Sequence, residues 1–68
     1  MDIAWEDGFT IKVDQDENTT VVAGNKEGLI SLAHILLDLA EGVPGNHIHL
    51  DEYNSLEDGS SELILAKM

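Results

Sequence analysis

The sequence has no cysteine, no arginine, a single proline and three aromatic residues among its 68 residues. Without cysteine no disulfide can form, so a domain this small depends on its core or on pairing with another chain. No stretch approaches the roughly 18 apolar residues that a membrane span needs. The start Met1-Asp2-Ile3 has no basic segment before an apolar core, which predicts no signal peptide and a cytoplasmic location. The length predicts one domain, residues 1–68.

Basic residues are equally scarce. Three lysines face fourteen aspartates and glutamates, which gives a net charge of −11. Such a chain would be repelled by nucleic acid and by an anionic membrane surface, so we expect neither as a partner. The charge favours a basic protein surface or cations instead. The hydrophobic content of 43% is too high for simple disorder.

Alternating and β-branched residues predict five strands. We expect loops over Asp14–Asn18 and Asn54–Ser60, and a tight turn at Asp7-Gly8. The last strand contains Leu63-Ile64-Leu65-Ala66, which is apolar on both faces and typical of a central strand. The five predicted strands are Ile3–Glu6, Phe9–Val13, Thr19–Ala23, Asn46–Tyr53 and Glu62–Lys67.

One helix is predicted over residues 26–41, with Asn25 as N-cap and Gly42 just after its end. The order β-β-β-α-β-β therefore predicts a small α+β domain, with a mostly antiparallel sheet and the helix packed on one face. Gly28 in the first helical turn suggests close packing there. The polar stripe of this helix consists of Glu27, Ser31, His34, Asp38 and Glu41.

The apolar side of that helix covers over half of its circumference, more than one sheet face can bury. We expect the Trp5 segment or a neighbouring protomer to cover the remainder, and a homodimer is one predicted state.

No motif predicts an enzyme or a cofactor. There is no G-x-S-x-G elbow, and Gly24-Asn25-Lys26-Glu27-Gly28 lacks the spacing of a phosphate-binding loop. His47, His49 and Asp51 alternate on one strand and would share a face, where the histidines are solvated or face an interface, or the three residues are ligands of a metal ion. The metal-binding protein is thus an alternative, as is a structural subunit of a larger assembly.

The segment Asp51–Asp58 combines four carboxylates with Tyr53 and Leu56. An anchor surrounded by charge is typical of a site that associates fast and binds tightly. The alternative is a solvated connection held by Leu56. The candidate partner-binding residues are Asp51, Glu52, Tyr53, Leu56, Glu57 and Asp58.

Four runs of residues resemble the small bacterial family called Immunity protein 32. They are Gly24–Leu29, Ser31–Ala33, His47–Glu52 and Gly59–Ile64, and the likeness extends from about Val21 to Lys67. The resemblance implies a cytosolic protein encoded beside a polymorphic toxin, which binds and neutralises that toxin. It supplies no binding residues. Many toxins of such systems are basic nucleases, and a charge of −11 has the sign expected of an inhibitor of one.

Overall fold

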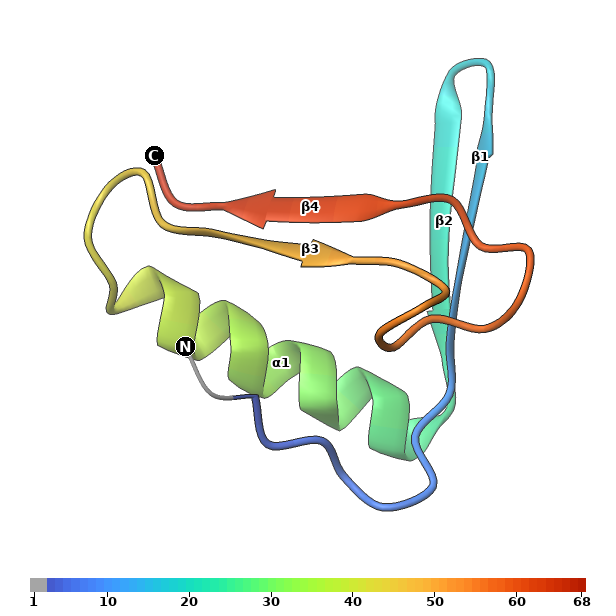
Figure 1. The fold of residues 1–68 in the computed structure, drawn as a ribbon, viewed down its shortest axis with the longest axis horizontal. Coiled ribbons are helices and arrows are strands. Elements are labelled where there is room, and N and C mark those ends of the chain that lie inside the picture. Colours follow the sequence, from blue (N-terminus) through green and yellow to red (C-terminus); the bar gives the residue numbers. More distant parts are fainter. Residues whose placement is uncertain (1–2) are drawn as a thin grey trace.

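The computed structural model describes residues 3–68, which form two β-hairpins around one helix (Figure 1). Both hairpins are antiparallel, so the predicted α+β class is confirmed. Met1 and Asp2, which entered the expectation about a signal peptide, lie outside the described residues. The elements are β1 (Ile11–Asp16), β2 (Thr19–Gly24), α1 (Lys26–Ala40), β3 (His47–Leu50) and β4 (Leu63–Ala66).

The N-terminal segment forms no strand over Ile3–Glu6, so the predicted order with three strands before the helix is wrong. The observed order is β-β-α-β-β. The predicted turn at Asp7-Gly8 is present, with the Phe9 N–H donating to the Glu6 carbonyl at 3.2 Å, but the residues before it form no strand. Instead Trp5 stacks on Phe9 with ring centroids 4.4 Å apart, and both rings pack against the core. Burial of this aromatic pair takes the place of cross-strand hydrogen bonds.

The first hairpin is longer than predicted, because the expected loop Asp14–Asn18 is mostly strand. Its register runs without interruption from Ile11 opposite Gly24 to Asp16 opposite Thr19. The tip half of this hairpin projects past β4 (Figure 1), and its side chains are exposed on both faces. Polar residues are tolerated there because backbone pairing, and not burial, holds that part of the strand.

The helix begins at the predicted N-cap. The side-chain Oδ1 of Asn25 accepts the backbone N–H of Gly28 at 2.7 Å and that of Thr10 at 3.0 Å. Its Nδ2 donates to the carbonyl of Gly8 at 2.9 Å. One amide side chain therefore caps the helix and ties the N-terminal segment to it.

The polar stripe of α1 is only partly solvated. Ser31 is fully buried, and its hydroxyl accepts the backbone N–H of Glu6 at 2.9 Å and donates to the carbonyl of Glu27 at 2.8 Å. Ser31 is therefore a polar residue of this stripe that packs inside the protein with both of its hydrogen-bonding roles filled. The N-terminal segment covers this side of the helix (Figure 1).

At its other end α1 stops at Ala40, with Glu41 as C-cap and Gly42 next, as predicted. The Gly42 N–H donates to the carbonyl of Leu39 at 3.0 Å, which tightens the last turn. Across residues 3–68, the structure has no helix that is both long and apolar enough to cross a membrane.

The second hairpin keeps the predicted alternation over a shorter strand than Asn46–Tyr53. Ile48 is half-buried and Leu50 is buried, while the two histidines between and before them are exposed. The expectation that the last strand is central is wrong, since β4 pairs only with β3 and Ile64 is 51% exposed.

The loop before β4 explains why the hairpins stay separate. The Glu57 N–H donates to the carbonyl of Ile11 at 2.9 Å, and the Ser61 N–H donates to the carbonyl of Val13 at 2.8 Å. The Ser60 hydroxyl accepts the Val13 N–H at 3.1 Å. This loop occupies the outer edge of β1 and excludes β4 from it.

The core lies between the helix, β1 and β3, and the loop after β3 contributes one side chain. Outside it, Leu29 and Leu36 are each 51% exposed and Leu37 is 66% exposed. Part of the wide apolar arc is therefore uncovered in the single chain, although the Trp5 segment packs on the core as expected. The buried apolar side chains are Ile11, Val13, Leu32, Ile35, Leu39, Leu50 and Leu56.

Gly28 allows the close approach between α1 and the N-terminal segment, because a Cβ at this position would overlap the carbonyl oxygen of Thr10. Helix propensity alone would favour alanine by ~1 kcal/mol. The overlap with backbone reverses that preference, so we expect Gly28→Ala to lower the free energy of unfolding in urea by about 2 kcal/mol. Ala33→Ser, on the exposed side of the same helix, should change it by less than ~0.5 kcal/mol. A Gly28→Ala variant as stable as the parent would contradict this packing.

Candidate functional site

The acidic loop after β3 is shaped by Asp51. Its backbone carbonyl accepts the N–H of Ser55 at 3.0 Å and of Leu56 at 2.8 Å. Its carboxylate Oδ1 accepts the N–H of Tyr53 at 2.9 Å and of Asn54 at 3.1 Å. A carboxylate that binds the amides just ahead of it stabilises a turn. Asp51 therefore fixes the course of the loop.

Two more of the predicted partner-binding residues also have structural contacts. Leu56 is 4% exposed and belongs to the core, so it holds the loop against the body of the protein. Glu52 is exposed, and its Oε2 accepts the backbone N–H of Gly59 at 2.9 Å. These contacts leave the loop well ordered on the surface.

The other three predicted residues project into solvent. Tyr53 is 91% exposed, which is unusual for a large aromatic side chain. Glu57 and Asp58 are exposed, and within residues 3–68 their carboxylates have neither a hydrogen bond nor an ion pair. The structure thus places one aromatic ring and two uncompensated carboxylates on the same loop.

The lysines form no ion pair with the carboxylates of this loop in residues 3–68. Lys12 Nζ lies 2.6 Å from the Asp14 carboxylate, and Lys67 Nζ donates to the carbonyl of Ala40 at 2.5 Å. In the part of the chain that the structure describes, Lys12–Asp14 is the lysine–carboxylate ion pair, and the His49–Glu62 contact is ionic only when the imidazole is protonated. The loop carboxylates therefore keep a strongly negative field.

The two histidines of β3 lie on its exposed face, with ring centroids 5.1 Å apart. His49 Nδ1 lies 3.4 Å from the Glu62 carboxylate. The carboxylate of Asp51, the third residue of the metal alternative, accepts backbone N–H groups of the loop. No group of three histidine, aspartate or glutamate side chains in residues 3–68 lies close enough to hold a metal ion.

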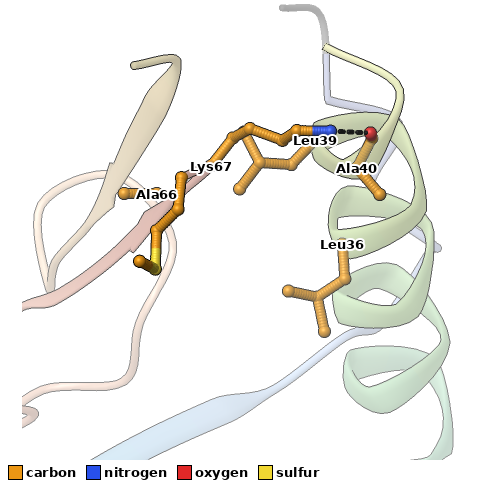
Figure 2. Close-up of a pocket in the computed structure, with 6 residues that line it drawn as sticks. Leu36, Leu39, Ala40, Ala66 and Lys67 are labelled. Carbon is orange, nitrogen blue, oxygen red and sulfur yellow. Dashed lines mark hydrogen bonds between the residues drawn. The ribbon is translucent and has the colours of Figure 1, made fainter. Parts of the chain in front are cut away.

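Sequence reasoning missed a shallow pocket where the last turn of α1 meets the end of β4 (Figure 2). Its volume is about 320 Å³, and Figure 2 shows the Lys67 side chain reaching across to the Ala40 carbonyl. The wide apolar arc was its one signal in the sequence, since nothing local predicts that the chain end meets the helix. The lining residues are Leu36, Leu39, Ala40, Ala66, Lys67 and Met68.

Comparison with protein families gives a match over most of the chain. The family model of Immunity protein 32 matches residues 19–68, which span β2, α1, β3, the acidic loop and β4. Neither a curated protein nor a solved structure matches the chain significantly. The match covers more than half of the sequence and agrees with the runs of residues that carry the resemblance. This chain belongs to the Immunity protein 32 family.

Proposed function

We propose that this chain is a cytoplasmic, non-enzymatic immunity protein that binds a cognate bacterial toxin and blocks its action. Membership of the Immunity protein 32 family is the observation that carries this proposal. An inhibitor of this kind works by occupying a surface of the toxin, so it needs a stable docking face and no catalytic group. The charge and shape of the chain are compatible with that role.

The proposed toxin surface is basic. The net charge is −11, and the carboxylates of Glu57 and Asp58 form no ion pair within residues 3–68. Opposite charge on two partners accelerates their encounter and selects against wrong partners. A basic nuclease is a toxin class with such a surface.

The acidic loop is the proposed contact site. Tyr53 supplies an exposed aromatic anchor, and Glu52, Glu57 and Asp58 add exposed negative charge on the same loop. Leu56 and Asp51, with the contacts described above, support the loop from below. The proposal therefore assigns positioning to Asp51 and Leu56, and contact to the other four residues of the candidate set.

We further propose that the chain can form a homodimer through the exposed flank of α1. Leu29, Leu36 and Leu37 lie on this flank and are each at least half exposed. Sedimentation equilibrium should then show a concentration-dependent mass above 7.4 kDa, which Leu37→Glu lowers. A single 7.4 kDa species at high micromolar concentration would contradict the dimer.

The immunity function has a direct test. Bacteria that produce the toxin encoded beside this gene should grow only when this chain is produced with it. The two purified proteins should form one complex in size-exclusion chromatography. If the toxin stays active and no complex forms, the proposed function is wrong.

The loop can be tested by association kinetics with that toxin. Glu57→Gln combined with Asp58→Asn removes two charges without changing shape, and should slow association about three- to tenfold at low salt. Asp38→Asn combined with Glu41→Gln removes the same charge from the exposed end of α1 and should slow it less. Equal effects of the two pairs would mean that overall charge, and not this loop, steers the encounter.

Tyr53→Ala separates the anchor from the charges. Loss of a buried aromatic anchor costs about 2 kcal/mol of binding, so dissociation should become about 30-fold faster while association changes little. An unchanged dissociation rate would place the anchor elsewhere.

Asp51→Ala tests the positioning role in the free protein. It removes an acceptor from two backbone amides and should lower the free energy of unfolding by about 1 kcal/mol. Tyr53→Ala should change it by less than ~0.5 kcal/mol, because this ring is 91% exposed. The opposite order of the two effects would contradict the assignment.

A further inference from the structure

The two outer edges of the first hairpin differ. Val13 lies opposite Val22, and both backbone groups of Val13 point away from β2, to Ser60 and Ser61. In two antiparallel strands, residues that lie opposite each other either exchange backbone hydrogen bonds or both direct their N–H and C=O groups away from the partner strand. The N–H and C=O of Val22 therefore point away from β1, and by the two-residue alternation those of Thr20 do as well.

Nothing covers this second edge. In the part of the chain that the structure describes, the backbone of Thr20 and Val22 has no hydrogen bond to any other segment. Every residue of Thr19–Ala23 is exposed, including Val21 at 50% and Val22 at 39%. The outer edge of β1 is closed by the loop before β4, whereas the edge of β2 is open.

The open edge also lacks the usual protection. Exposed edge strands normally carry a charge, a proline or a bulge that blocks the pairing of a further strand. All six residues of β2 are uncharged, none is proline, and the register with β1 is unbroken. The chain has fourteen acidic residues, and none of them lies in β2.

We propose that the edge of β2 binds an extended strand of the cognate toxin, which pairs with the backbone of Thr20 and Val22 and continues the hairpin. This inference rests on the proposed immunity function and adds a second contact to the acidic loop. Main-chain hydrogen bonds supply the pairing, and side chains beside the edge choose the sequence of the added strand.

The surroundings of the edge define that strand. At the tip end, the carboxylates of Asp16 and Glu17 are exposed and favour a lysine or arginine of the added strand. At the helix end, Leu29 lies over β2, with its Cδ2 3.4 Å from the position of a Cβ on Gly24. That end favours an apolar side chain.

A second copy of this chain is the less suitable occupant. The β2 strand of a second copy has no basic side chain to meet Asp16 and Glu17, whereas a basic strand of the toxin is attracted to them. Self-pairing through β2 is therefore an outcome that would overturn the proposal.

Hydrogen exchange of the full-length chain tests the edge without any substitution. In the free protein the amides of Thr20 and Val22 should exchange fast, whereas those of Val21 and Ala23, which pair with β1, should be protected. Adding the purified toxin encoded beside this gene should slow exchange at Thr20 and Val22 at least about tenfold. If the complex forms and these two amides still exchange fast, the edge proposal is wrong and the proposed function stands. If no complex forms, both fail.

A matched pair of variants tests the same point by affinity. Gln15 and Thr20 lie opposite each other, so proline at either position removes an outward N–H and no bond between β1 and β2. Thr20→Pro should raise the Kd for the toxin at least about tenfold, and Gln15→Pro should change it by less than about twofold. Equal effects of the two variants would overturn the proposal. Concentration-dependent protection of Thr20 and Val22 in the free chain would assign the edge to a second copy.

Discussion

The contact between the Thr10 carbonyl and the first turn of α1 is the constraint on which the rest of the structure depends. This oxygen accepts the Asn25 N–H at 3.1 Å and lies where any side chain on Gly28 would be. The Asn25 amide then bonds to Gly8 and to the backbone on both sides of the contact. The start of the helix, the N-terminal segment and the entry into β1 are thereby fixed at one point, and Ile11 follows directly into the core.

Electrostatics sets the character of the surface. Lys12 is paired with Asp14, and Lys67 donates to the carbonyl of Ala40 at the end of α1, where the negative end of the helix dipole favours a cation. Two of the three lysines thus have local structural partners, and most carboxylates have no counter-charge in the chain. Their mutual repulsion destabilises the free protein, and a basic partner would relieve it. The same excess charge therefore lowers the stability of the free protein and, in the proposed function, favours a basic partner.

Local signals in the sequence predicted the helix, its N-cap, the close packing at Gly28 and the alternation in the second hairpin. They failed where a long-range contact decided the outcome. Ile3–Glu6 alternates like a strand, but Trp5 stacks on Phe9 and packs against the core, and the segment forms no strand. The apolar run of β4 resembles a central strand, but the loop before it already occupies the edge of β1. For the candidate site, the sequence predicted its composition, and only the structure separates projecting from supporting side chains.

In the acidic loop, the side chains that project into solvent are different from those that hold the loop in place, and this separation has a consequence for how the sequence can change. Tyr53, Glu57 and Asp58 contribute almost nothing to the core, whereas Asp51 and Leu56 hold the loop in place. Substitutions at the projecting positions therefore have little effect on folding. A lineage that keeps the two supporting residues can therefore change the exposed side chains of this loop repeatedly, with its scaffold intact at every step.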